Sequence, residues 1–131
     1  MTDPKDQLAA VGREPRPFAE SRSLDLAQFL GRQIEWSTAT FGPGERSQGL
    51  VDHVWRELRE VMRAQTPEEE LAEWVDVAIL ALDAAWRLGF TPEQVCRAML
   101  AKAEKNRARR WPDWRTADLW RAIEHVREPE E

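Results

Sequence analysis

The chain has 131 residues, of which 42% are hydrophobic and 33% are charged, a balance typical of one globular domain. Its 24 acidic residues outnumber its 19 Lys and Arg residues, and the net charge of −5 argues against a general nucleic-acid-binding protein. No run approaches the roughly 20 apolar residues that span a bilayer, and the first residues lack the pattern of a secretory signal, so we expect a cytoplasmic protein. Because Cys96 is the single cysteine, an internal disulfide and a multi-cysteine zinc site are excluded.

The first part of the chain predicts an arm followed by two helices. Residues 1–22 are polar and contain prolines, without a sustained apolar period, which indicates a flexible arm. Ser23 is expected to cap a first helix over 24–40, where apolar residues recur at helical spacing. Glycines around a proline at 42–44 end that helix and predict a tight loop whose backbone amides face a ligand. A second helix is expected over 48–65.

Two similar start signals predict the next two helices. Thr66–Glu69 combines an N-cap threonine, a proline at the first helical position and a glutamate three residues after the cap. This capping box starts a third helix that runs to Leu88, with Gly89 as its stop. Thr91–Gln94 repeats the signal and starts a fourth helix that runs to about Arg109.

The C-terminal part predicts one further helix. Thr116 is expected to cap a helix that runs to about Val126, before an acidic tail over 128–131. The globular domain is therefore placed at residues 23–127. Since no alternating strand pattern occurs, the fold class expected is all-α, an antiparallel bundle of four to five helices.

Four acidic residues form two pairs with the same spacing on the second and third helices. Glu57 and Glu60 share one helix face about one turn apart, and Glu73 and Asp76 repeat this arrangement. In an antiparallel pair of helices the four carboxylates would converge into an oxygen-rich site suited to Mg²⁺ or Mn²⁺. The alternative is two solvated faces balanced by nearby arginines. The apolar residues around Glu73 and Asp76 favour the metal site, because a stretch so apolar predicts a helix that is nearly surrounded by protein one turn further on, where unpaired acids would be costly.

Further polar residues are candidates for binding a phosphorylated substrate. Asp83 returns to the face of Asp76 after two turns and is either an outer ligand, an anchor for a phosphate-binding lysine, or part of a structural salt bridge. Lys102, Asn106 and Arg109 form a polar stripe on the fourth helix, which either contacts a triphosphate or is an exposed helix face.

Aromatic and polar residues in the first two helices are candidates for a nucleobase pocket. They are Trp36, Ser37, Phe41 and His53. Aromatic faces stack on bases and a polar group can read a base edge. Most of the seven tryptophans are expected to be core residues, however, and a lone histidine on a helix is more often structural. The sequence Trp111–Trp114 either closes over a ligand or packs the last helix.

The acidic spacing and several other segments resemble one known family. Glu57-Leu-Arg-Glu60, followed after 12 residues by Glu73-Trp-Val-Asp76, resembles the ExxE and ExxD metal motif of the MazG-like, all-α nucleoside triphosphate pyrophosphatases. Over about residues 24–127 the chain is similar to the dATP/dGTP pyrophosphohydrolase branch, which includes MazZ-type phage enzymes. The segments that carry this similarity are Arg32-Gln-Ile-Glu-Trp-Ser, Phe41-Gly-Pro-Gly, Asp52-His53, Glu73-Trp-Val-Asp, Ile79-Leu-Ala-Leu-Asp83 and Trp111-Pro-Asp-Trp114. Arg56 stands where many MazG proteins carry a further glutamate, so the number of metal ions stays open.

The resemblance implies a metal-dependent enzyme that converts dGTP, dATP or both to the monophosphate and pyrophosphate, in a host cytoplasm if the gene belongs to a phage. The resemblance also implies that the four acids hold Mg²⁺ and act in catalysis. It favours Lys102 and Asn106 as phosphate-binding residues. It further implies a homodimer or homotetramer. An alternative is a catalytically inactive helical module that binds nucleotides or proteins. A di-iron bundle is disfavoured because neither His53 nor His125 follows a glutamate by three residues.

Overall fold

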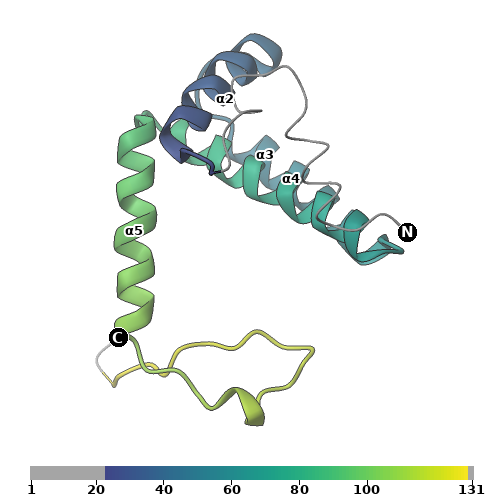
Figure 1. The fold of residues 1–131 in the computed structure, drawn as a ribbon, viewed down its shortest axis with the longest axis vertical. Coiled ribbons are helices and arrows are strands. Elements are labelled where there is room, and N and C mark those ends of the chain that lie inside the picture. Colours follow the sequence, from purple (N-terminus) through teal and green to yellow (C-terminus); the bar gives the residue numbers. More distant parts are fainter. Residues whose placement is uncertain (1–22, 130–131) are drawn as a thin grey trace. The chain divides into compact units, whose positions relative to one another are not determined.

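The computed structural model describes residues 23–129, and the arm expected over 1–22 lies outside them. The described residues contain four α-helices, one 3₁₀ helix and no strand, which confirms the all-α fold class (Figure 1). The elements are α2 (Leu26–Phe41), α3 (Ser47–Arg63), α4 (Pro67–Trp86), α5 (Pro92–Ala108) and η1 (Trp114–Thr116). Over this part of the chain, no helix is both long and apolar enough to cross a bilayer. The chain separates into two compact units, one ending at Cys96 and one beginning at Arg97.

The helix starts follow the capping chemistry of the sequence, with one change of residue. The Thr66 hydroxyl accepts from the Glu69 amide at 3.2 Å, and the Glu69 carboxylate accepts from the Gln65 amide at 2.8 Å. At the start of α5, Thr91 and Gln94 exchange backbone-to-side-chain bonds of 3.2 and 2.9 Å, a complete capping box. The cap of α2 is Asp25, not Ser23 as predicted, because its carboxylate accepts from the Gln28 amide at 3.0 Å.

Helices α3 and α4 form an antiparallel hairpin, and the two lie side by side in Figure 1. The short connection over residues 64–66 turns the chain back. Glu57 of α3 meets Glu73 and Asp76 of α4. His53, one turn earlier in α3, lines a pocket with Ile79 and Leu80, which follow Asp76 in α4. This reversed order of contacts means that the hairpin brings the two acidic pairs toward one another.

The main apolar core lies where α2, the end of α4 and the start of α5 meet. Its buried members are Leu30, Trp86 and Val95, one from each helix. Smaller contributions come from partly buried neighbours, which are Leu26, Phe29, Ile34, Leu82, Ala85 and Cys96. This core fixes the C-terminal half of α4 against α2, and thereby one wall of the pocket described below.

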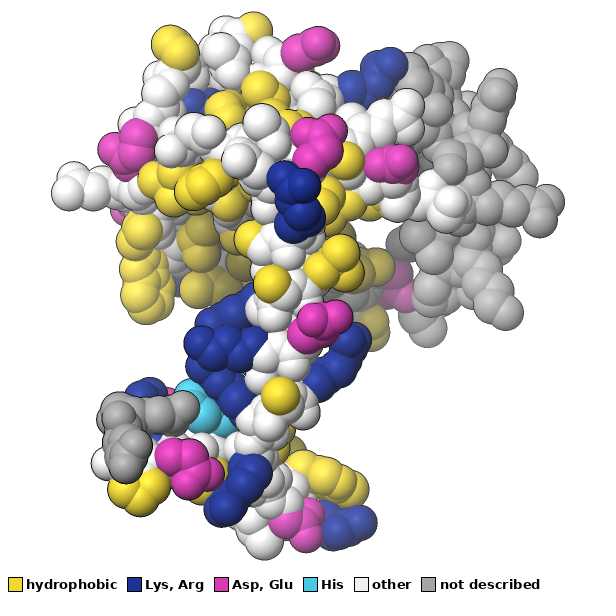
Figure 2. All heavy atoms as spheres, turned by 90° about the vertical axis from the view of Figure 1, so that its left-hand side faces the viewer, with side chains coloured by type: hydrophobic (Ala, Val, Ile, Leu, Met, Phe, Trp, Pro, Cys, Tyr) yellow, Lys and Arg dark blue, Asp and Glu magenta, His cyan; other side chains and the backbone are white. Residues whose placement is uncertain are grey.

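The middle of α4 is more exposed than the end of the helix. Around the two acids, Leu71, Trp74 and Val75 are each about half exposed within one copy of the chain, whereas one turn further on, where the apolar stretch predicted a helix nearly surrounded by protein, Ile79 and Leu80 are partly buried and Asp83 is buried. Trp86, in contrast, belongs to the core. Figure 2 shows apolar side chains on the surface of the first unit. A hydrophobic run in the sequence predicts buried side chains correctly only where another element of the chain packs against them.

The second unit lacks the last helix predicted over 116–126. Only the 3₁₀ turn Trp114–Thr116 forms, and the Thr116 hydroxyl donates back to the Asp113 carbonyl at 2.8 Å instead of capping a following helix. Leu119 and Trp120 are almost fully exposed. A short amphipathic segment gains most of its helical stability from packing its apolar face, and nothing in residues 23–129 covers these two side chains.

Candidate active site

Three carboxylates gather where α3 and α4 face each other. One oxygen from each of Glu57, Glu73 and Asp76 lies within 4.8 Å of the others. Glu57 and Glu73 are partly buried and Asp76 is exposed, so the cluster has one side open to solvent. The geometry therefore brings together one acid of the first predicted pair and both acids of the second.

The cluster holds more negative charge than its surroundings compensate. The pKa of Glu73 is raised, first by a hydrogen bond with the Glu57 carboxyl group and then by partial desolvation and by the charges of Glu57, Asp76 and Glu60. The pKa of Asp76 is also raised, first by desolvation and then by the charge of Glu57, while His53 opposes part of this increase. A divalent cation would remove this repulsion, because it replaces a shared proton as the compensating positive charge.

Glu60 lies apart from the three clustered oxygens. Its carboxylate forms a 3.5 Å ion pair with Arg63, and its side chain is about half exposed. It is near enough for its charge to contribute to the raised pKa of Glu73. Its predicted role as a metal ligand stays a prediction.

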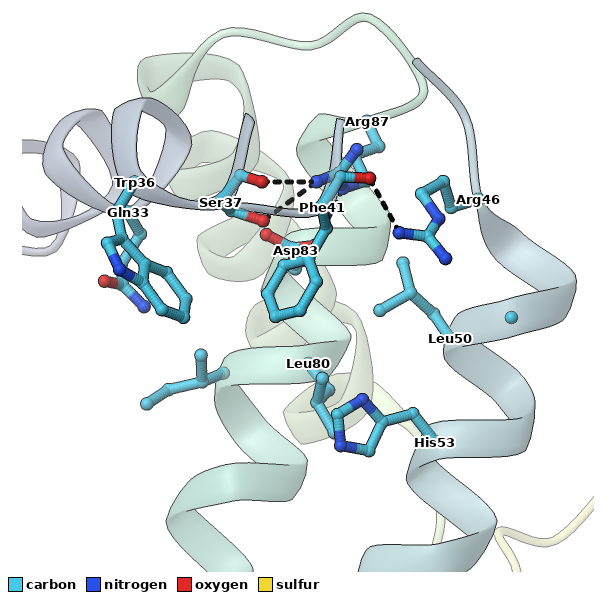
Figure 3. Close-up of a pocket in the computed structure, with 12 residues that line it drawn as sticks. Gln33, Trp36, Ser37, Phe41, Arg46, Leu50, His53, Leu80, Asp83 and Arg87 are labelled. Carbon is cyan, nitrogen blue, oxygen red and sulfur yellow. Dashed lines mark hydrogen bonds and ion pairs between the residues drawn. The ribbon is translucent and has the colours of Figure 1, made fainter. Parts of the chain in front are cut away.

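A cavity of about 210 Å³ lies beside the acidic cluster, between α2, α3 and α4 (Figure 3). It is lined by Gln33, Trp36, Ser37, Phe41, Arg46, Gly49, Leu50, His53, Ile79, Leu80, Asp83 and Arg87. All four residues that the sequence suggested for a nucleobase pocket are among them. The Trp36 and Phe41 rings meet edge to face, with centroids 5.5 Å apart, and half of the Trp36 side chain is accessible. The cavity thus offers aromatic surface together with several polar groups.

His53 connects this cavity to the carboxylates. Its side chain lines the cavity, and its Nε2 atom lies 3.3 Å from Oε1 of Glu57. Ile79 and Leu80, which line the same cavity, follow Asp76 by three and four residues on α4, so they lie about one turn further along the same face. The cavity and the cluster are therefore two adjoining parts of one site.

Arg87 forms a buried network that shapes the cavity and that sequence reasoning missed. Its Nε donates to Asp83 at 2.8 Å, and its two terminal nitrogens donate to the carbonyls of Gly42 and Gly44 and to the carbonyl and hydroxyl of Ser37. Gly42 and Gly44 both have positive φ angles. The loop was expected to turn its amides toward a ligand, but two of its carbonyls turn toward Arg87. The spacing of four residues between Asp83 and Arg87 could have predicted their ion pair, because residues at this spacing are neighbours on a helix surface.

Asp83 forms a structural salt bridge with Arg87, which is one of the alternatives that the sequence left open for it. The Asp83 side chain is 11% exposed. A role of Asp83 in substrate binding stays a prediction. Two more polar residues of the cavity, Gln33 and Arg46, were not singled out from the sequence. Gln33 precedes Trp36 by three residues, so it shares a helix face with a residue that was predicted.

The remaining candidates belong to the second unit. Lys102 is exposed on α5, Arg109 donates to the Asn106 side chain at 3.0 Å, and the Trp111 indole donates to the Asn106 carbonyl at 2.7 Å. This stretch is strongly basic, with Arg97, Lys102, Lys105, Arg107, Arg109 and Arg110 against Glu104 alone. Figure 2 shows a group of Lys and Arg side chains on this unit. Contact of these residues with a phosphate stays a prediction.

Comparisons with known proteins agree with this geometry. The family model for dATP/dGTP pyrophosphohydrolase matches residues 29–131, which include the acidic cluster, the cavity and the basic part of α5. The Eaa protein of Salmonella phage P22 is 35% identical over 79 residues, 60% of this chain. The aligned part is 24% of that phage protein, so the chain matches only about a quarter of its length. No solved structure shows a significant match. The match to the family model covers most of the chain, and the chain therefore belongs to the dATP/dGTP pyrophosphohydrolase family.

Proposed function

We propose that this protein hydrolyses a purine deoxynucleoside triphosphate, dGTP or dATP, to the monophosphate and pyrophosphate with the help of a divalent cation. The observation that carries the proposal is the cluster of Glu57, Glu73 and Asp76 beside an aromatic cavity. A nucleotide needs both parts, a site for its phosphates and a surface for its base. The family of the chain supports the reaction class.

The donor set fits Mg²⁺ or Mn²⁺. Both ions prefer carboxylate and water oxygens, and Mg²⁺ keeps several waters when it is bound by one or two carboxylates and substrate phosphates. The open side of the cluster, at the exposed Asp76, leaves room for such partners. We propose Glu57, Glu73 and Asp76 as ligands, and Glu60, whose charge acts on Glu73, as a fourth. When bound, the cation would neutralise charge on the phosphate oxygens and favour ionisation of the attacking water.

The side chains around the cluster have separate tasks in this proposal. Trp36 and Phe41 hold the base and so orient the α-phosphate toward the acids, which lowers the barrier by positioning. A carboxylate that is not used as a ligand can accept the proton of the water that attacks the α-phosphorus. His53, whose Nε2 lies 3.3 Å from Oε1 of Glu57, keeps that carboxylate directed toward the cluster. A separate proposal, which the family alone supports, is that Lys102 and Asn106 of the second unit bind the phosphates that leave.

The proposal is tested by product analysis. The purified protein is incubated with each deoxynucleoside triphosphate and Mg²⁺, and the products are separated by ion-exchange chromatography. We expect monophosphate and pyrophosphate in equal amounts, and we expect neither with the Glu73→Gln variant. Glu35→Gln is the matched control, because Glu35 is an exposed acid on α2 outside the cluster and the cavity. Binding of nucleotide without turnover would support the inactive module instead, and release of inorganic phosphate would indicate a different bond cleavage.

We also propose that two copies associate through the exposed apolar face of α4 around Leu71, Trp74 and Val75. Contiguous apolar surface of this kind is costly in water and often marks an interface. Light scattering after size-exclusion chromatography should give a mass of two or four chains, which Leu71→Lys should reduce. A wild-type protein that elutes as a monomer at micromolar concentration would rule the interface out.

A further inference from the structure

Arg46 and Arg87 both line the cavity, but they differ in how many of their N–H donors are used by other protein groups. Arg87 is 5% exposed, and its Nε and both terminal nitrogens donate to protein acceptors, five in all. A guanidinium has five N–H groups, so none remains for a ligand. Arg87 therefore positions the walls of the cavity and does not bind what enters it.

Arg46 uses fewer of its N–H donors than Arg87 does. It is exposed at the start of α3, and within residues 23–129 the bond found for its guanidinium runs from one terminal nitrogen to the Phe41 carbonyl, at 2.8 Å. The adjacent Glu45 carboxylate accepts a hydrogen bond from the Ser47 amide and not from the Arg46 guanidinium. Figure 3 shows the Arg46 guanidinium across the cavity from Trp36 and Gln33. The Phe41 bond holds the arginine over the cavity, and its other N–H groups donate to no acceptor among residues 23–129.

The position of Arg46 along α3 separates it from the phosphate end of the site. Arg46 precedes Glu57 by 11 residues, which is about 16 Å along a helix at 1.5 Å per residue. His53 lies between them and adjoins Glu57. A nucleotide with its phosphates at the carboxylates would therefore present its base, and not its phosphates, to Arg46.

We propose that Arg46 is a specificity-determining residue that donates two hydrogen bonds to the O6 and N7 atoms of a guanine base held against Trp36. An arginine fork matches these two acceptors, whereas adenine presents an amino group in place of O6 and repels one of the donors. The cavity is thereby selective for 6-oxopurines over 6-aminopurines. This inference rests on the proposed function for the location of the phosphates.

The test compares bases that differ by one group. We expect kcat/KM to be similar for dGTP and dITP, which share O6 and N7, and about five- to 150-fold lower for dATP, the discrimination typical of a bidentate contact. Arg46→Met should abolish this difference. Arg46→Gln should shift preference toward dATP, because a glutamine amide pairs with N6 and N7 of adenine. Arg59→Met is the matched control, since Arg59 is an exposed arginine of α3 that lies outside the cavity.

A second measurement separates this inference from the proposed function. Calorimetric titration of dGMP and dAMP in EDTA reports base recognition without metal and without hydrolysis, and the same Arg46-dependent preference for dGMP is expected. Loss of hydrolysis with retained dGMP preference would refute the proposed reaction only. If Arg46→Met weakens dGTP and dATP equally, Arg46 serves the phosphates or the loop, and the inference is wrong. It is also wrong if wild-type protein prefers dAMP, or binds neither monophosphate at millimolar concentration.

Discussion

Replacing Arg87 with methionine should strongly destabilise the protein while leaving the acidic cluster chemically intact. Arg87 is nearly fully buried and ties the end of α4 to Ser37 and to the loop carbonyls of Gly42 and Gly44. Methionine fills most of the same volume but donates no hydrogen bond. The substitution therefore leaves the Asp83 carboxylate, 11% exposed, without its cation.

The magnitude follows from the burial of the pair. Removing one partner of a buried ion pair typically costs about 3–5 kcal/mol, because the other charge remains uncompensated. The exposed pair Arg56–Asp52, with side chains 70% and 63% accessible, should contribute at most about 1 kcal/mol. With a urea slope of about 1.5 kcal/mol/M, Arg87→Met should lower the unfolding midpoint by roughly 2–3 M, and Arg56→Met by well under 1 M.

Urea unfolding followed by circular dichroism measures both changes. If Arg87→Met does not fold, Arg87→Lys keeps the reasoning testable, since lysine retains the charge beside Asp83 but cannot supply five N–H donors. It should fall between wild type and the methionine variant. Equal midpoints for Arg87→Met and Arg56→Met would refute the claim that this network stabilises the fold.

Further predictions concern the two parts of the site. The pKa values of Glu73 and Asp76 are raised, so the folded metal-free protein binds protons at these groups more tightly than the unfolded chain does. The stability that these groups contribute is therefore present in acid and is lost as pH rises through the raised pKa values. Mg²⁺ binds the ionised forms of these carboxyl groups. The increase in Tm caused by Mg²⁺, measured by differential scanning fluorimetry, should therefore be largest at neutral pH and disappear in acid. An increase in Tm that does not depend on pH would contradict this. Trp36→Leu should raise KM for the nucleotide by about five- to 150-fold, the range for one base stacked on an aromatic ring, while Trp55→Leu, outside the cavity, should not. An unchanged KM for Trp36→Leu would place the base elsewhere.

Sequence reasoning located the helices where local chemistry decides the outcome. The threonine capping boxes at Thr66 and Thr91 and the glycine stop at Gly89, with φ of 103°, depend on a few adjacent residues, so their effect can be read directly. The last helix failed for the opposite reason. The apolar spacing around Leu119 and Trp120 is helical in pattern, but a helix of that length needs a packing surface, which the sequence does not show.

The candidate site was predictable to the extent that it follows helical periodicity. Glu57, Glu73 and Asp76 could be grouped because three-residue spacing places acids on one face and a short connection makes the helices antiparallel. Arg87 and Arg46 could not be assigned, because their roles depend on contacts between α2, α3, α4 and the loops that join them. For arginine the sequence gives the charge, but only the fold determines how many of its five donors are used.

The binding of Mn²⁺ to metal-free protein, followed by electron paramagnetic resonance, tests most directly whether the three carboxylates hold a divalent cation. Free Mn²⁺ gives a strong signal that is lost on binding, and Mg²⁺ should compete for the same site. We expect saturable binding by wild type and by Glu35→Gln, and a large loss of affinity in Glu73→Gln and Asp76→Asn. Binding that is unchanged by both substitutions, or absent from the wild-type protein with nucleotide present, would contradict the assignment of this cluster as the metal site.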